Sequence, residues 1–136
     1  MQRGFSLMEL MIVIAIMAIL VGVAIPSYSQ YTKRAHYTEL VQATATYKVA
    51  VALCYQHRGN LNDCASGQDG IPAQQPETQD QLVQSIVVTT GGIITVTPND
   101  QYGFHEEDQY ILTPHVQQHR LTWKSSGKAV EKGYAK

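Results

Sequence analysis

The chain has 136 residues, a formal net charge of −1 and 44% hydrophobic residues. This length leaves room for one small domain beyond a single membrane segment. The near-zero net charge gives no general reason to expect nucleic acid binding, and the sequence shows no repeat, heptad array or long low-complexity tail.

The first predicted element is a membrane helix from Phe5 to Ile25, a stretch that is apolar apart from Ser6 and Glu9. As an α-helix it would be about 30 Å long, which is the thickness of the hydrocarbon core of a bilayer. It is longer than the core of a secretory signal peptide, and residues 25–28 form no small-residue cleavage site. Because Arg3 lies in the short head, the positive-inside rule predicts a cytoplasmic N-terminus.

Glu9 is the most informative residue of this segment, because a carboxylate in lipid costs a few kcal/mol on insertion scales. Such a residue is expected to be functional and to have a partner. No Lys, Arg or His lies between Gly4 and Lys33, so we expect that partner in another chain. The alternative is that Glu9 lies near the cytoplasmic headgroups and reaches them with its side chain.

The sequence GFSLMEL at Gly4 to Leu10, followed by an apolar run and then Pro26, resembles the start of a type IV prepilin. The resemblance implies that a prepilin peptidase cleaves between Gly4 and Phe5 and that the new N-terminus of Phe5 is methylated. It also implies a partner for Glu9, the freed amine of Phe5 on a neighbouring subunit. Glu9 would then set the register of assembly, because its burial is tolerable only when subunits align.

Gly22 and Pro26 are the predicted weak points of the helix. Pro26 lies inside a pattern that is helical on both sides, so it removes one backbone hydrogen bond and should kink or loosen the helix without ending it. The resemblance implies local melting near Pro26 in an assembled filament. A tolerated kink in a membrane helix fits the residues equally well.

Beyond Pro26 the chain becomes amphipathic and has no helix breaker from Tyr28 to Tyr55, so the helix is expected to continue to about residue 57. Gly59, preceded by cations, is suited to end it. One face of this half-helix repeats at steps of three and four and should pack on a sheet. Its members are Tyr37, Leu40, Thr44, Tyr47, Val51 and Cys54.

Cys54 and Cys64 flank the junction between this helix and an irregular loop of residues 61–81. Both lie beyond the membrane segment, where an oxidising compartment is expected. We predict a disulfide between them, stabilising by roughly 2 to 3 kcal/mol in the chain-entropy model. No metal site is predicted, because two cysteines without suitably spaced histidines do not resemble one. Many pilins have a disulfide near the C-terminus, whereas residues 125–136 contain no cysteine, so the resemblance is to enteric-type members of the type IVa-like major prepilins.

The rest of the chain predicts a sheet of four short strands, at residues 82–90, 93–97, 110–113 and 120–124. Gly91-Gly92 between the first two is a hairpin signal. The fold class is therefore α+β, with a long N-terminal helix packed on a roughly four-stranded antiparallel sheet, as the resemblance also implies. The expected parts are a leader at 1–4, a membrane or filament-core half-helix at 5–27 and a head at 28–136, which includes the amphipathic half-helix 28–57.

Charge is segregated along the head. Residues 59–119 lack Lys and Arg but contain Asp63, Asp69, Glu77, Asp80, Asp100, Glu106, Glu107 and Asp108. The tail opposes Glu131 with Arg120, Lys124, Lys128, Lys132 and Lys136. We hypothesise that tail and acidic loops meet between neighbouring subunits, the alternative being that both are simply solvated. The tail also offers weak contacts to DNA phosphates, multiplied along a filament.

Catalytic motifs are missing from the sequence. His115 and His119 are four residues apart, but Pro114 and strand-like surroundings argue against a helix that presents both. The run Glu106-Glu107-Asp108 beside His105 is typical of a solvated loop, with calcium capture as the alternative. Neither a nucleophile elbow nor a phosphate loop is present. We predict that the chain is not an enzyme and needs no cofactor.

The predicted function is that of a structural type IV pilus subunit, held in the inner membrane until it polymerises into an extracellular filament. The resemblance implies four kinds of partner: other copies of the chain, prepilin peptidase, an inner-membrane assembly platform and an outer-membrane secretin. Such filaments serve adhesion, twitching motility and DNA uptake. The alternatives are a pseudopilin of a type II secretion system and a low-abundance pilus subunit that binds DNA or a surface receptor.

Overall fold

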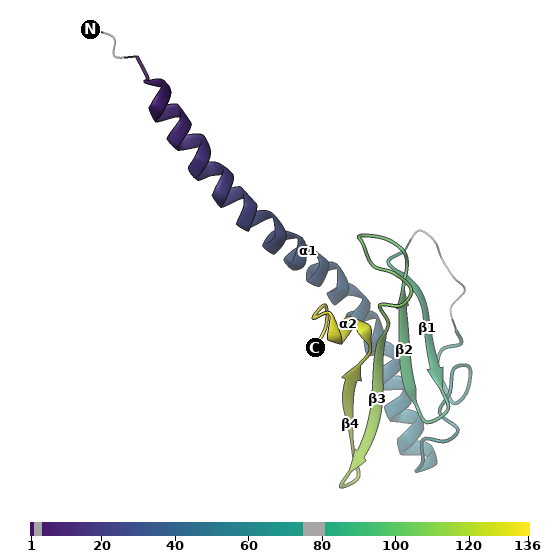
Figure 1. The fold of residues 1–136 in the computed structure, drawn as a ribbon. Coiled ribbons are helices and arrows are strands. Elements are labelled where there is room, and N and C mark those ends of the chain that lie inside the picture. The colour runs from purple at the N-terminus through teal and green to yellow at the C-terminus, as the bar shows by residue number, and fades with distance from the viewer. Residues whose placement is uncertain (2–3, 75–80) are drawn as a thin grey trace. The chain divides into compact units, whose positions relative to one another are not determined.

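The computed structural model describes residues 1, 4–74 and 81–136, and for Pro26 and Ser27 it describes the backbone. The chain divides into two compact units, Met1–Thr32 and Lys33–Lys136. Its elements, in order, are α1 (Leu7–Arg58), β1 (Val83–Thr89), β2 (Ile93–Pro98), β3 (Tyr110–Gln117), β4 (Arg120–Ser126) and α2 (Lys128–Glu131) (Figure 1). The predicted α+β class is confirmed.

Helix α1 has 52 residues and contributes to both units. It ends at Arg58, close to the predicted end, because Gly59 adopts the left-handed conformation (φ +73°) and its N–H donates to the carbonyl of Tyr55. His57 and Arg58 lie in the last turn, where cations interact favourably with the helix dipole.

The four strands form one antiparallel sheet in the order β1-β2-β3-β4. Thr90, Gly91 and Gly92 connect β1 to β2, with positive φ at both glycines. The predicted hairpin is confirmed, with a loop one residue longer than the two glycines. Strand β3 extends past its predicted end through Pro114 to Gln117. It pairs with β2 only at residues 110–112. Pro114 lies beyond this paired part, so its missing N–H removes no backbone hydrogen bond between β3 and β2.

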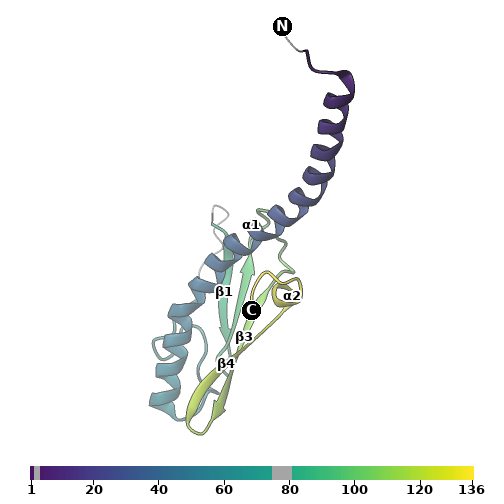
Figure 2. The same cartoon turned by 90° about the vertical axis from the view of Figure 1, so that its left-hand side faces the viewer.

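The core of the second unit lies between the sheet and the C-terminal half of α1, which runs along one face of the sheet (Figures 1 and 2). All six residues predicted for the helix face are at most 3% exposed. Opposite them, alternate strand residues are buried: Ile86, Val88, Ile94, Val96, Tyr110 and Leu112. Apolar residues recur about every 3.6 residues along the helix and every second residue along the strands, so each element has one apolar face. These two faces pack against each other.

A short helix, α2, follows β4 and was not predicted. Gly127 makes the turn into it with φ +103°, and a Cβ at this position would collide with the carbonyl oxygen of Gln109. That carbonyl accepts a hydrogen bond from the N–H of Ala129, whose side chain is fully buried. The tail of the chain is therefore part of the packed head.

Candidate assembly surface

The described residues directly before α1, 4–6, are exposed and lie outside any helix or strand. The described residues Gly4 and Phe5 precede the first helical residue, Leu7, and the Phe5 side chain is 83% exposed. The bond between Gly4 and Phe5, predicted as a cleavage site, therefore lies outside the helical hydrogen-bond ladder.

The first turn of α1 is closed by a reciprocal pair of hydrogen bonds between Ser6 and Glu9. The backbone N–H of Glu9 donates to the hydroxyl of Ser6 (3.2 Å), and the backbone N–H of Ser6 donates to the carboxylate of Glu9 (3.1 Å). This is a capping box, which satisfies two N–H groups that the first turn of a helix leaves unpaired. Glu9 therefore has a partner within its own chain, which the sequence analysis missed.

The apolar surface of the first unit is fully open. Its side chains between Leu7 and Ile25 are each 49% to 77% exposed: Leu7, Met8, Leu10, Met11, Ile12, Val13, Ile14, Ile16, Met17, Ile19, Leu20, Val21, Val23 and Ile25. Within the described residues, α1 is long and apolar enough to cross a membrane. An apolar surface of this extent is typical of a segment that lies in lipid or packs on a partner.

The two predicted weak points lie within one continuous helix, since α1 passes through both Gly22 and Pro26. A Cβ added at Gly22 would meet no other atom within 4 Å, so packing within the chain does not require glycine there. The kink at these residues stays a prediction.

Comparison with known proteins shows what this N-terminal geometry resembles. Residues 1–25 match the family model of the prokaryotic N-terminal methylation motif. The type IV pilus subunit protein TapA of Aeromonas hydrophila is 48% identical over 71 residues, which are 52% of this chain and 50% of TapA. Prepilin peptidase-dependent protein D of Escherichia coli is 40% identical over 96 residues, 71% of this chain and 63% of that protein. The type IV major pilin protein PilE1 of Neisseria gonorrhoeae is 35% identical over 99 residues, 73% of this chain and 45% of PilE1.

Over the matched residues the chain is similar to type IV pilus proteins. The chain spans from about half to 63% of the length of these three curated relatives. The methylation motif covers Gly4, Phe5, Glu9 and Gly22 but stops before Pro26.

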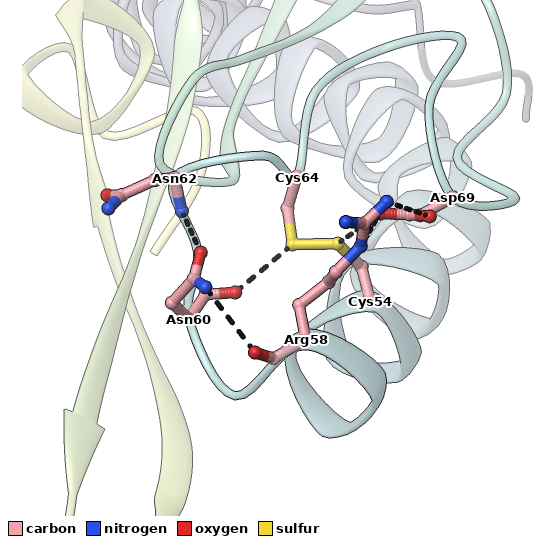
Figure 3. Close-up of a disulfide and its surroundings, with 6 residues drawn as sticks. All are labelled: Cys54, Arg58, Asn60, Asn62, Cys64 and Asp69. Atoms are coloured by element: carbon pink, nitrogen blue, oxygen red, sulfur yellow. Dashed lines mark hydrogen bonds and ion pairs between the residues drawn. A yellow bond between two sulfur atoms is a disulfide. The ribbon is translucent and has the colours of Figure 1, made fainter.

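In the second unit, the predicted disulfide between Cys54 and Cys64 is present (Figure 3). It ties the last turn of α1 to the following loop. Arg58 reinforces the same junction, because its Nε and Nη2 atoms donate to both carboxylate oxygens of Asp69 at 2.7 and 2.9 Å. The hydrogen bond from Arg58 lowers the pKa of Asp69 and raises the pKa of the guanidinium.

The C-terminal tail is held by ion pairs of two lysines. Lys128 Nζ lies 2.5 Å from the carboxylate of Glu107, and this hydrogen bond lowers the pKa of Glu107. Lys132 Nζ lies 2.5 Å from the carboxylate of Asp108, and this hydrogen bond raises the pKa of Lys132. Arg34 on α1 donates to the carbonyl of Gly133 (2.8 Å). We name this set the tail clasp: Arg34, Glu107, Asp108, Lys128, Lys132 and Gly133.

Aromatic rings complete the attachment of the tail. Tyr134 packs against Tyr37 and Phe104, with ring centroids 5.9 and 5.4 Å away. The Tyr37 hydroxyl donates to the backbone carbonyl of Asp108 (2.6 Å). Burial raises the pKa of Tyr37, with Asp108 as a second cause, so this phenol stays protonated in the physiological range. Ring contacts of Tyr134 thus attach the tail to α1 and to the loop before β3.

The tail clasp joins the basic tail and the acidic loops within one chain, and the hypothesis that they meet between neighbouring subunits stays a hypothesis. Lys128 and Lys132 pair with Glu107 and Asp108 of the same chain, because α2 turns back onto the loop before β3. Asp69 pairs with Arg58, and Asp100 lies 2.8 Å from His105. Two further acids of the hypothesis, Glu77 and Asp80, lie outside the described residues.

The acidic run beside His105 is bound by protein groups. Glu106 accepts a hydrogen bond from Gln84 (3.0 Å), and Asp108 accepts one from the backbone N–H of His105 (3.1 Å). The described residues contain no group of three or more metal-ligating side chains. His115 lies on β3, and His119, with φ +62°, lies in the turn after it. The structure therefore gives these acids structural partners.

The sequence analysis missed two features of the structure, the capping box and the tail clasp. The spacing Ser6-x-x-Glu9 before an apolar run is itself the signature of a capping box and was sufficient to find it. The tail clasp had no comparable signal, because its partners are more than 20 residues apart and opposite charges alone do not specify which residues pair.

Proposed function

We propose that the chain is the structural subunit of a type IV pilus and polymerises through the N-terminal half of α1. The observation that supports this most strongly is the open apolar surface from Leu7 to Ile25, interrupted on that helix by the carboxylate of Glu9. Burying such a surface against other copies removes apolar area from water or lipid contact and is favourable when the helices fit closely. The names of the relatives agree with this proposal.

Processing is proposed to occur between Gly4 and Phe5. Both residues are exposed and precede the helix, which leaves their peptide bond accessible to a membrane peptidase. Methylation would then modify the new amine of Phe5, as the matched motif suggests. Gly4→Val should block cleavage and leave the subunit in the membrane, detected as an unshifted precursor on a gel.

Glu9 is proposed to have two successive partners. In the precursor its carboxylate accepts the N–H of Ser6, which satisfies part of its hydrogen-bonding capacity but leaves its charge uncompensated. After cleavage, the protonated amine of Phe5 on a neighbouring subunit would supply the positive charge that compensates the Glu9 carboxylate. A paired and hydrogen-bonded carboxylate is tolerable in an apolar core, whereas an unpaired one is costly.

Substitutions at Ser6 and Glu9 test the capping hydrogen bonds and the negative charge of Glu9 independently. Glu9→Gln keeps an oxygen for the cap but removes the charge, whereas Ser6→Ala removes one capping bond and keeps the charge. We expect membrane insertion and cleavage in both variants, no ordered filaments from Glu9→Gln or Glu9→Val, and filaments at reduced yield from Ser6→Ala. Electron microscopy of sheared surface fractions measures this. Normal filaments from Glu9→Gln would overturn the charge-register proposal.

The proposed location is the inner membrane, with a cytoplasmic N-terminus, before assembly and the cell exterior after it. The proposed partners are other copies, prepilin peptidase, an assembly platform in the inner membrane and a secretin in the outer membrane. Long surface filaments that contain this subunit would distinguish a pilin from a pseudopilin.

A further inference from the structure

The sheet has two outer strands, β1 and β4 (Figure 1). The outer edge of β1 is occupied in part by the chain itself. The N–H of Val88 donates to the hydroxyl of Ser66 (2.8 Å), and the N–H of Ser66 donates to the carbonyl of Val88 (2.9 Å). In the described part of the chain, no segment makes backbone hydrogen bonds of this kind to the outer edge of β4. That edge is therefore open to another molecule.

The register of the β3–β4 hairpin shows which backbone groups of β4 point outward. Its loop consists of Gln118 and His119, both with positive φ, so Gln117 and Arg120 form the hydrogen-bonded pair that closes the turn. Hydrogen-bonded pairs alternate with pairs that are not hydrogen-bonded along two antiparallel strands. The residues of β4 that bond to β3 are therefore Arg120, Thr122, Lys124 and Ser126. The residues between them direct their N–H and C=O groups away from the sheet, and we name them the β4 edge: Leu121, Trp123 and Ser125.

Cations lie beside the β4 edge on both faces of the sheet. Arg120 and Lys124 are exposed, and in the described residues their side chains make no ion pair or hydrogen bond. On the other face, Nζ of Lys48 on α1 lies 5.8 Å from the ring centroid of Trp123. The four strands contain no Asp or Glu. A strand that adds to β4 would therefore meet positive charge on both of its faces.

These charges make a second copy of the chain a poor partner for the β4 edge. Antiparallel pairing of two β4 strands can bring Arg120 of one copy opposite Lys124 of the other, and like charges in opposite positions destabilise a strand pair. Lysine on an outer strand is a common protection against such self-association. The other outer strand, β1, carries no acid and already bonds to Ser66. The charges instead favour a partner strand that is acidic.

We propose that the β4 edge binds an extended acidic peptide of another protein, which adds to the sheet as a further strand. The backbone groups of Leu121, Trp123 and Ser125 hold the main chain of the peptide, as in other cases of strand addition. Side chains of the peptide alternate between the two faces of the sheet. Acids at every second position face Arg120 and Lys124, which are about 13 Å apart along β4. The β-branched residues between these acids lie beside Leu121 and Trp123.

The test uses the full chain in detergent micelles and a fluorescent peptide of about eight residues in which Glu and Val alternate. Fluorescence anisotropy measures the affinity, and NMR measures the hydrogen exchange of individual backbone amides. A control peptide has the same sequence but carries N-methyl groups on the alternate amides that face β4. It keeps the charge and lacks the hydrogen-bond donors, and the protein itself is unchanged.

Two matched variants of the chain test the charge. Lys124→Gln removes a cation beside the β4 edge. Lys33→Gln gives the same net charge but removes a cation of α1 that lies beside Gly103 and Tyr134. Both lysines are exposed, so we expect both variants to fold.

We expect the peptide to bind and to slow hydrogen exchange at the amides of Leu121, Trp123 and Ser125, which are unpaired in the free chain. The amides of Thr122 and Lys124 are already paired with β3 and should change little. N-methylation of the peptide should weaken binding by about fivefold for each hydrogen bond removed. Lys124→Gln should weaken binding more than Lys33→Gln does.

Three results would overturn the proposal: no binding of the peptide, equal binding of its N-methylated form, or equal effects of the two lysine variants. Exchange at the β4 edge that slows with rising concentration of the chain alone would assign this edge to a second copy, and would overturn it as well. The measurement needs no filament, so its outcome is independent of the proposed function.

Discussion

Lys132 Nζ lies 2.5 Å from Oδ1 of Asp108, whose side chain is fully buried. The second carboxylate oxygen accepts the backbone N–H of His105, and the Asp108 carbonyl accepts the hydroxyl of Tyr37. One residue therefore joins α1, the loop before β3 and the tail after α2.

Removing the cation of this pair should destabilise the head more than removing its exposed neighbour. Lys132→Met leaves the buried Asp108 carboxylate without a counter-charge, which is the costly way to break an ion pair. Lys128→Met breaks a pair whose acid, Glu107, is 56% exposed, and such pairs contribute little. We expect a clearly larger fall in melting temperature for Lys132→Met, measured by circular dichroism in detergent. Equal falls in melting temperature for the two variants would show that the buried Asp108 carboxylate does not depend on Lys132 more than Glu107 depends on Lys128.

Stability should decline in acid. Because Lys128 lowers the pKa of Glu107 and Arg58 lowers the pKa of Asp69, these carboxylates stabilise the fold above their ordinary values of 4.5 and 3.8. Their contribution is lost as pH falls through the lowered values. We expect the denaturation midpoint to drop progressively below about pH 4.5. Lys128→Gln should flatten part of that dependence, and an unchanged profile would contradict the assignment to Glu107.

Opening the disulfide should lower the free energy of unfolding by about 3 kcal/mol in the chain-entropy model, because Cys54 and Cys64 close a short loop. Chemical denaturation with and without reductant measures this difference. The double variant Cys54→Ser/Cys64→Ser controls for effects of the reductant. The Arg58–Asp69 pair bridges the same junction and should keep the reduced head folded at low temperature.

The two buried tyrosines of α1 should respond oppositely to loss of their hydroxyl groups. The Tyr47 hydroxyl is buried and has no hydrogen-bond partner in the part of the chain that the structure describes. Tyr47→Phe should therefore stabilise the head by about 1 kcal/mol. Tyr37→Phe, its matched control, removes the bond to the Asp108 carbonyl and should destabilise by about 1 kcal/mol. Denaturant titration measures the free energy of unfolding of both variants. A lower value for Tyr47→Phe than for the wild type would show that the Tyr47 hydroxyl makes a stabilising contact.

Local patterns were sufficient to predict the helix, its core face and the first hairpin. The face that includes Tyr37 and Val51 follows from helical period alone, and Gly91-Gly92 specifies its turn by conformational preference. Cys54 and Cys64 could be paired because the chain contains only two cysteines.

The tail could not be predicted in the same way. Residues 128–131 are too few to show a helical period, and Ala129 becomes a core residue only because Gly127 turns the chain over Gln109. The signs of the charges suggested pairing of the tail with acids, but not that Lys128 and Lys132 pair within one chain. Which residues pair depends on how the folded chain brings distant segments together, and the pattern of neighbouring residues in the sequence does not contain this information.

The tail clasp also has a consequence for biogenesis. Tyr37 and Phe104 receive their covering ring from Tyr134, which lies beyond α2. Because Tyr134 follows all four strands in the sequence, this cover can form only after the whole sheet has been synthesised. A chain cut before residue 132 would leave the rings of Tyr37 and Phe104 without this cover and the buried Asp108 carboxylate without its cation, so its core would be exposed to solvent.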